Sequence, residues 1–164
     1  MSEHWDITVM LGGPSEEREV SLQSGKAVVE ALDSLGHRVT PLDPIPGEWS
    51  LPEKVDLVFL ALHGTYGEDG AIQAELEKLG VPYTGCGPAA SALAFDKVKS
   101  KQVFEEQGIP TARFTICDSA HCEKPESFGL PVVLKPAKQG SSVGVEILSS
   151  YEDWDSMVKQ VLSF

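Results

Sequence analysis

Three loops in this chain collect the polar side chains that could bind a ligand or do chemistry, and they span residues 12–19, 63–70 and 135–144. The first contains Glu17 and the second begins with His63, while the third combines lysines with glycines and serines. A carboxylate and an imidazole can hold charged groups of a substrate or move protons. Glycine-rich backbone can turn its N–H groups toward phosphate oxygens. Each acid or histidine also has a structural explanation, because a helix dipole favours Glu17 and a strand end can hold His63.

The first two loops each follow a predicted strand. Residues 57–62 form an unbroken apolar run, which is typical of a parallel strand covered on both faces. The predicted strands of this region are Asp6–Leu11, Arg38–Leu42, Leu57–Leu62 and Val81–Thr84. Loops at the carboxyl ends of parallel strands meet at one edge of the sheet, where ligands bind in α/β folds. We therefore expect Glu17 and His63 to share a cleft.

Helical periodicity alternates with these strands and predicts an α/β fold with a Rossmann-like parallel sheet. The predicted helices are Val20–Leu35, Ala71–Leu79, Ala89–Phe95, Asp96–Gln107 and Glu152–Leu162. The pattern changes near Asp96, which predicts one domain over residues 1–95 and an α+β domain over residues 96–164.

The second domain is predicted to contain three short strands, Ala112–Ile116, Val132–Lys135 and Val143–Leu148, of which the last two form a hairpin. Its final helix carries Trp154, Met157, Val158 and Val161 on one face. A hairpin and one helix offer little cover for that face. We therefore expect an incomplete domain with exposed apolar surface.

Composition limits the possible functions. The chain has 13 basic and 25 acidic residues, a net charge of -12, which argues against a broad surface for nucleic acid or membranes. It contains neither a signal peptide nor an apolar run long enough to span a membrane, so we expect a cytoplasmic protein. Three cysteines without a CxxC pair predict free thiols in a reducing compartment. A zinc site at Cys117, His121 and Cys122 is an alternative that lacks a second pair of ligands.

The third loop and a neighbouring segment match other motifs only in part. The loop is not a Walker A motif, because it has no Gly-Lys-Ser/Thr. Residues 140–144 match the nucleophile elbow G-x-S-x-G around Ser142, but a strand pattern follows and no histidine lies downstream. Residues 85–90 match the dinucleotide motif G-x-G-x-x-A, yet Pro88 and a short helix are atypical of it.

Five segments taken together resemble D-alanine–D-alanine ligase, a family of the ATP-grasp superfamily. They occur in the family's order: LGGPSEEREVSLQSG, ALHGTYGEDG, GVPYTGCG, ASALAFDKVKSK and LPVVLKPAKQGSSVGV. The resemblance covers almost the whole chain. It implies an amino-terminal substrate domain over residues 1–95, followed by an incomplete ATP-grasp central subdomain over residues 96–164. It also implies that the chain corresponds to about half of such an enzyme and would not turn over alone.

The resemblance carries over to particular residues. Glu17 is expected to hold the ammonium group of the first D-alanine, and His63 to orient that substrate. Ser141 is expected to form a hydrogen bond with Glu17. Lys97 and Lys135 match the family's two lysines that contact phosphate. The loop that closes over the phosphates is expected to comprise Gly140, Ser141, Ser142 and Val143.

The implied cofactors and partners are ATP, Mg²⁺, D-alanine and a second copy of the chain in a homodimer. No residue of this sequence is expected to ligate the metal, because the family's metal ligands correspond to positions beyond Phe164. Two positions depart from the family pattern: Gln139 stands where an acid is common, and Cys86 stands where serine is common.

The expected function is ATP-dependent ligation of two D-alanine molecules through an acyl phosphate, for peptidoglycan synthesis. A related ligase that uses D-lactate as its second substrate is one alternative, and a non-catalytic binding module of the same fold is another. An assay of the full-length enzyme with D-alanine and D-lactate would separate the two ligases. A gene whose reading frame continues for a comparable length after Phe164 would favour a ligase over a module.

Overall fold

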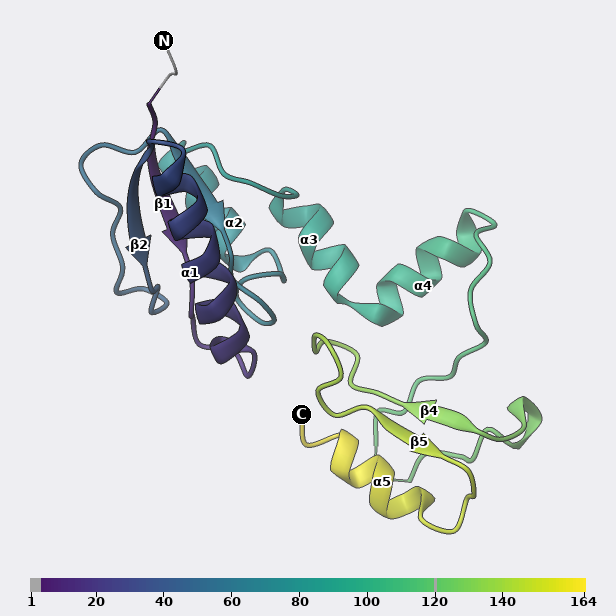
Figure 1. Ribbon diagram of the computed structural model, residues 1–164. Coiled ribbons are helices and arrows are strands. Elements are labelled where there is room, and N and C mark those ends of the chain that lie inside the picture. The colour runs from purple at the N-terminus through teal and green to yellow at the C-terminus, as the bar shows by residue number, and fades with distance from the viewer. Residues whose placement is uncertain (1–3, 120) are drawn as a thin grey trace. The chain divides into compact units, whose positions relative to one another are not determined.

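The computed structural model describes residues 4–119 and 121–164 and divides the chain into two compact units, Met1–Phe95 and Asp96–Phe164. Each unit has its own sheet, and Figure 1 shows the helices that pack on each. Within the described residues, no helix is long and apolar enough to cross a membrane.

The first unit is built on a parallel sheet of three strands in the order β2-β1-β3. The strands are β1 (Asp6–Met10), β2 (Arg38–Leu42) and β3 (Leu57–Leu60). Their register places Val9 opposite both Pro41 and Phe59. The expected α/β class with a parallel sheet is confirmed. Because all strands run the same way, their carboxyl ends and the loops that follow lie at one edge.

Helices α1 (Arg18–Ser34) and α2 (Ala71–Leu79) pack on the two faces of this sheet, and α3 (Pro88–Phe95) follows them. Side chains of β1 alternate between the two faces, as the pleat of a strand requires. Ile7 and Val9 belong to a cluster that includes Val28 and Leu32 of α1. Met10 instead belongs to a cluster with Ile72 and Leu76 of α2.

One predicted strand of the first unit is absent. The segment 81–84 makes only an isolated bridge between Tyr83 and Val58, with hydrogen bonds from Val58 N to Pro82 O and from Thr84 N to Val58 O. Pro82 has no N–H to donate and Gly85 has a φ of 105°, so the ladder cannot extend. The expectation of a strand over Val81–Thr84 was therefore wrong.

The second unit contains the predicted antiparallel hairpin, formed by β4 (Val132–Leu134) and β5 (Glu146–Leu148). Helix α4 (Lys97–Glu106) precedes it, a 3₁₀ turn spans Glu126–Phe128, and α5 (Trp154–Val161) follows it. Trp154 is 1% exposed and packs with Val132, Leu148 and Val158.

The segment between α4 and the hairpin corrects two expectations. Residues 112–116 form no strand, but Cys117, Cys122 and Phe128 pack against the Trp154 cluster. They cover the apolar face of α5 that we expected to be exposed. On the hairpin, by contrast, the side chains of Val133 and Ile147 are exposed, as expected.

The cysteines also differ from expectation. Cys117 and Cys122 are joined by a disulfide with a Cα–Cα distance of 5.3 Å, whereas Cys86 is free and exposed. The prediction of three free thiols was wrong for this pair. Among the described residues, no group of three His, Cys, Asp or Glu side chains could hold a metal ion, so the zinc alternative has no support here.

We predict that Gly25→Ala destabilises the first unit, although alanine favours helices over glycine by about 1 kcal/mol. A Cβ at position 25 would lie 2.2 Å from the Cβ of Leu11, so α1 would have to move away from the end of β1. Overpacking of this kind costs roughly 1–3 kcal/mol. The measurement is urea unfolding followed by NMR signals of β1.

The matched control is a pair of variants at exposed Gln23 of the same helix, Gln23→Ala and Gln23→Gly. The difference in unfolding free energy between these two variants measures helix propensity without the contact to Leu11, and it should favour alanine. A Gly25→Ala variant that gained the same stability would contradict the packing argument.

Candidate functional site

The carboxyl ends of β1 and β3 are tied together by Ser21 of α1. Its buried hydroxyl accepts a hydrogen bond from Gly12 N at 2.8 Å and donates one to Ala61 O at 2.8 Å. Both bonds use atoms just beyond the strands. The loop after β1 and the loop after β3 are therefore held side by side at the sheet edge.

Glu17 and His63 meet at this edge through Ser15. The Ser15 hydroxyl accepts from Glu17 N at 3.1 Å and donates to His63 O at 2.6 Å. The Glu17 carboxylate lies against Gly64, where a Cβ would be 2.8 Å from Glu17 Oε2. With a φ of 70°, Gly64 also adopts a left-handed conformation that favours glycine. The structure thus brings together the two residues that the sequence predicted to share a cleft.

The imidazole ring of His63 lies between a hydroxyl and a carboxylate. Its Nε2 is 3.1 Å from Ser24 Oγ, and its Nδ1 is 3.7 Å from Glu68 Oε1. The other oxygen of Glu68 accepts a hydrogen bond from Gly64 N at 3.1 Å. The ring remains one-third exposed, so it is positioned by protein groups and is still accessible to a ligand.

The rest of the second loop is held by side chains of the protein. Asp69 accepts from Tyr66 N at 2.9 Å and from Ala71 N at 3.0 Å, which fixes the turn into α2. The Tyr66 hydroxyl accepts from Trp49 Nε1 at 2.7 Å and donates to Glu75 at 3.2 Å. Burial raises the pKa of Tyr66 to about 12, so this phenol stays protonated.

The first loop is fixed by an ion pair. Arg18 donates to both oxygens of Asp43 and to Gly13 O, while Asp43 accepts from Gly13 N at 2.9 Å. The hydrogen bonds from Arg18 lower the pKa of Asp43, with a further contribution from Gly13 N–H. The backbone of Gly13, in the loop that leads to Glu17, is thereby held at both its N–H and its C=O.

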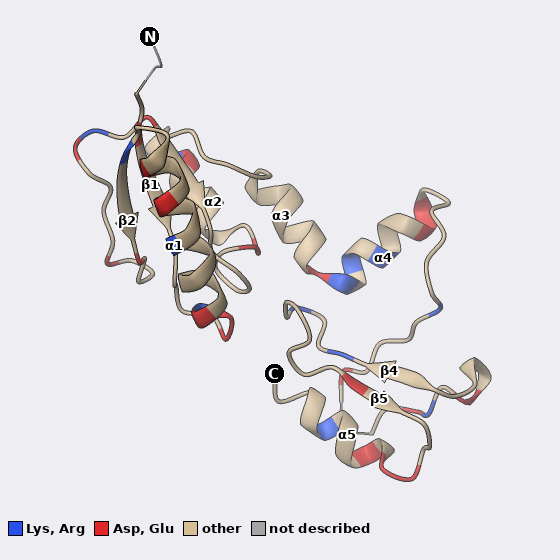
Figure 2. Cartoon of the chain, viewed as in Figure 1, with Lys and Arg blue, Asp and Glu red and all other residues tan. Residues whose placement is uncertain are grey.

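In the second unit, Lys97 and Lys135 form a pair of positive charges. Burial lowers the pKa of Lys97, and the charge of Lys135 lowers it further, whereas Asp96 raises it. Lys97 Nζ donates to Gln139 O, and its backbone N–H donates to Ala137 O at 3.0 Å. The carboxylate of Asp96 accepts from two N–H groups at the start of α4. Figure 2 shows blue segments at the start of α4 and between β4 and β5.

The loop before β5 is a run of tight turns. Val143 N donates to Gly140 O and Val145 N to Ser142 O, both at 3.2 Å, while Ser141 has a φ of 47°. Gln139 uses its side-chain amide to donate to Phe164 O at 3.3 Å. A strand follows Ser142 instead of a helix, so the loop is no nucleophile elbow.

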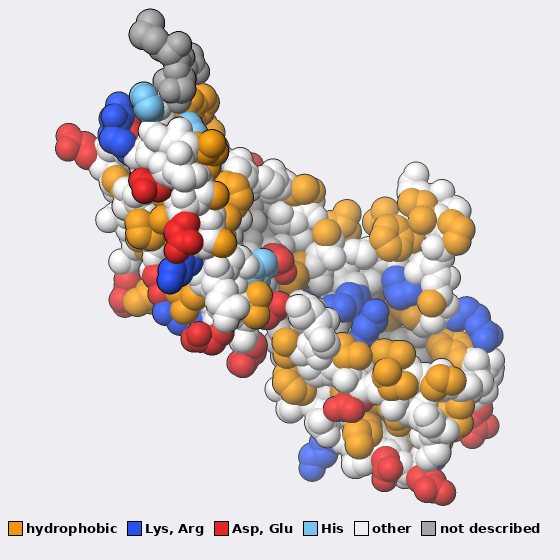
Figure 3. Space-filling model, viewed as in Figure 1, with side chains coloured by type: hydrophobic (Ala, Val, Ile, Leu, Met, Phe, Trp, Pro, Cys, Tyr) orange, Lys and Arg blue, Asp and Glu red, His pale blue; other side chains and the backbone are white. Residues whose placement is uncertain are grey.

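A pocket of about 790 Å³ lies in the second unit beside these lysines. Its charged lining includes Lys97, Lys101, Arg113, Lys135 and Lys138. Apolar side chains such as Phe114 and Val133 line the rest, and Figure 3 shows Lys and Arg side chains gathered beside apolar ones on this unit. This size and lining suit a ligand with an apolar ring and an anionic group.

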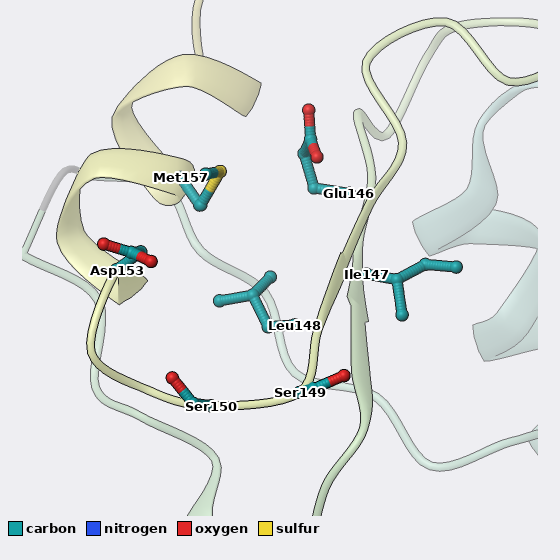
Figure 4. A pocket seen from close by; sticks show the side chains of 7 residues that line it. All are labelled: Glu146, Ile147, Leu148, Ser149, Ser150, Asp153 and Met157. Carbon is teal, nitrogen blue, oxygen red and sulfur yellow. The ribbon is translucent and has the colours of Figure 1, made fainter.

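A smaller pocket of about 320 Å³ has the opposite character. It lies between β5 and the start of α5, and Figure 4 shows the carboxylates of Glu146 and Asp153 on either side of Leu148 and Met157. The remaining lining residues are Ile147, Ser149 and Ser150, so no cation lines the pocket. Its carboxylates would repel phosphate, so the larger pocket is the better anion site of the two.

The sequence matches two protein-family descriptions along its length. Residues 46–86 match "D-ala D-ala ligase N-terminus" and residues 103–164 match "D-ala D-ala ligase C-terminus". The D-alanine–D-alanine ligase of Geobacter sulfurreducens is 46% identical over 158 residues, which is 93% of this chain and 50% of that protein. The ligase of Methylacidiphilum infernorum is 42% identical over 154 residues, 94% of this chain and 50% of that protein. The chain belongs to the D-alanine–D-alanine ligase family.

Solved structures agree with this assignment. The D-alanyl-alanine synthetase A of Vibrio cholerae aligns with a TM-score of 0.86 at 27% identity, covering all of this chain and 57% of the other. The D-alanine–D-alanine ligase of Bacillus anthracis complexed with ATP aligns with a TM-score of 0.82 at 33% identity, covering 99% and 54%. The chain thus spans about half the length of the relatives that it matches.

The family-derived site residues fall into two groups. Glu17 and His63 lie together in the first unit, while Lys97, Lys135 and the loop 140–143 belong to the second. The hydrogen bond expected between Ser141 and Glu17 would join the two units and stays a prediction. Sequence reasoning missed Ser21 and Ser24, although their spacing with Gly25 places all three on one side of α1.

We predict that Lys135→Gln raises the pKa of Lys97, because it removes a positive charge that disfavours the charged form of Lys97. The pKa of Lys97 can be followed by NMR of lysines labelled at the carbon next to Nζ. Lys159→Gln is the control, since Lys159 is an exposed lysine of α5. Equal shifts in both variants would mean that Lys135 has no specific influence on Lys97.

Proposed function

We propose that this chain is the part of a D-alanine–D-alanine ligase that binds the first D-alanine and the phosphates of ATP. The observation that carries the proposal is the bridge by Ser15, which sets the Glu17 backbone and the His63 backbone at one sheet edge. Family membership and the lysine pair of the second unit support it.

The reaction has two steps. A carboxylate oxygen of the first D-alanine attacks the γ-phosphorus of ATP, the bond to the bridging oxygen breaks, and ADP leaves with that oxygen. The product is an acyl phosphate. The amine of the second D-alanine then attacks the acyl carbon, loses a proton and gives a tetrahedral intermediate. Collapse of this intermediate expels phosphate and leaves the peptide bond.

Glu17 and His63 would handle the first D-alanine. Its ammonium group needs an anion, and the Glu17 carboxylate at the sheet edge provides one. Its carboxylate needs a donor that orients it toward the phosphorus, and an N–H of the one-third exposed His63 ring would provide one. Both groups bind before any bond changes, so they contribute chiefly by placing the nucleophile.

Lys97 and Lys135 would act on the phosphates. An anionic carboxylate must approach an anionic phosphoryl group, and two nearby ammonium groups offset that repulsion. The loop Gly140–Val143 would cover the phosphates and exclude water, which would otherwise hydrolyse the acyl phosphate. The N–H of Val143 is used in a turn bond to Gly140 O, so that turn would have to open before this N–H could bind phosphate.

Further parts of the proposal rest on the family alone. Mg²⁺, when bound, would offset negative charge on the phosphates. The residues described here include no cluster of three metal ligands, so we assign none of them to it. We also propose a homodimer, and a cytoplasmic location because the reaction consumes ATP.

The decisive experiment joins this chain to the half of the Geobacter sulfurreducens ligase that it does not match. The chimera should release ADP only when D-alanine is present and should form D-alanyl-D-alanine, detected by chromatography. Lys97→Gln and Lys135→Gln should each lower kcat about a hundredfold, whereas Lys159→Gln should leave it unchanged. A folded chimera that bound ATP without turnover would overturn the proposal.

We predict that Glu17→Gln in this chimera raises KM for the first D-alanine about tenfold or more, because an amide cannot replace the charge-assisted bond to the ammonium group. Glu16→Gln removes the same charge from an exposed neighbour and is the matched control. Steady-state kinetics with varied D-alanine decide between them. If both variants raise KM equally, the effect comes from the loss of one negative charge in this region and not from a specific contact of Glu17.

A further inference from the structure

The hydroxyl of Ser24 in α1 contacts the His63 ring directly, and the proposed mechanism has not used it. Ser24 Oγ lies 3.1 Å from His63 Nε2 and 2.9 Å from Val20 O, one helical turn earlier in α1. Ser15 and Ser21 instead donate to backbone carbonyl oxygens of the loop after β3, His63 O and Ala61 O. Ser24 is thus placed to orient the ring, while Ser15 and Ser21 hold the backbone of the loop that carries it.

A serine hydroxyl has a single proton and two lone pairs. The carbonyl of Val20 can only accept, and a helical serine commonly donates to the carbonyl four residues earlier. Because the Ser24 proton is donated to Val20 O, Ser24 Oγ can only accept a hydrogen bond from His63 Nε2. The ring must then carry a proton on Nε2.

This arrangement determines what the opposite nitrogen does. Nδ1 faces Glu68 Oε1 at 3.7 Å, on the side of the ring away from Ser24. With a proton on Nε2, Nδ1 is an acceptor in the neutral ring and a donor only in the imidazolium. Nδ1, beside Glu68, could therefore donate an N–H to the substrate carboxylate only in the imidazolium form.

We propose that Ser24 is a positioning residue for His63: it accepts a hydrogen bond from Nε2–H and so fixes both the tautomer and the orientation of the ring. The consequence for catalysis rests on the proposed ligase function, but the tautomer is a property of this chain alone. The two can therefore be tested separately.

The first test is NMR of the 164-residue chain labelled with ¹⁵N in its four histidines. The His63 signals are assigned from their loss in His63→Gln. In the unsubstituted chain, the signal of Nε2 should be that of a protonated nitrogen. Ser24→Ala should shift His63 toward a mixture of tautomers, and Ser24→Thr should restore the original pattern, since a helical threonine can make the same bond to the carbonyl.

Ser34→Ala is the matched control. Ser34 lies on the same helix and donates to a backbone carbonyl, Ala31 O, at 2.7 Å. If Ser24→Ala does not fold, Ser24→Cys keeps the size with a weak acceptor and takes its place. A His63 spectrum that is unchanged in the folded Ser24 variant would overturn the proposal, whatever the activity.

The second test uses the chimera. Ser24→Ala should lower kcat about fivefold, the effect of one lost hydrogen bond, with KM for ATP unchanged and with recovery in Ser24→Thr. Altered tautomers with full activity would refute the role of Ser24 in the reaction. An inactive unsubstituted chimera would count against the ligase function, and the NMR result would still decide the tautomer.

Discussion

The buried hydroxyl of Ser21 is the interaction on which the first site depends. A hydroxyl removed from water must have its hydrogen bonds satisfied inside the protein. Ser21 satisfies its own by joining Gly12 N to Ala61 O, atoms that belong to the ends of neighbouring strands. The parallel register fixes how far each strand extends, and this bond fixes the gap between the loops that follow. Glu17 can then lie against Gly64 only because both loops start from that fixed pair.

Much of the fold could be predicted from the sequence because apolar periodicity reports burial. Strands β1, β2 and β3, the helices and the hairpin β4-β5 were placed within a few residues. The strand predicted at residues 112–116 failed for a reason that periodicity does not report, because side chains occupy its backbone partners and neighbours. Residues 112–116 have an apolar pattern, yet Arg113 stacks on Phe128 and Lys101 on Phe114, each at 5.0 Å. Lys101 also donates to Ala112 O, which removes an acceptor that a strand would need.

In the candidate site, the charged residues could be predicted from the sequence, but the serines that position them could not. Glu17, His63, Lys97 and Lys135 stand in motifs whose residue types already suggest binding of charged groups. The serines of α1 gave no such signal, because a helical serine is equally compatible with solvent, a backbone carbonyl or a neighbouring element. Only the three-dimensional packing shows that Ser21 faces Ala61 and that Ser24 faces the ring of His63.

The lysine pair shows how an acidic chain can still bind phosphate. A net charge of -12 disfavours anions at long range, but salt screens that field beyond about 10 Å. Within the second unit, Lys97 and Lys135 repel each other, and Lys97 is also partly desolvated, so its pKa is lowered. Both effects disfavour the charged pair in the free protein. A bound phosphate would supply the counter-charge, so relief of the repulsion between the two lysines would contribute to the driving force for binding.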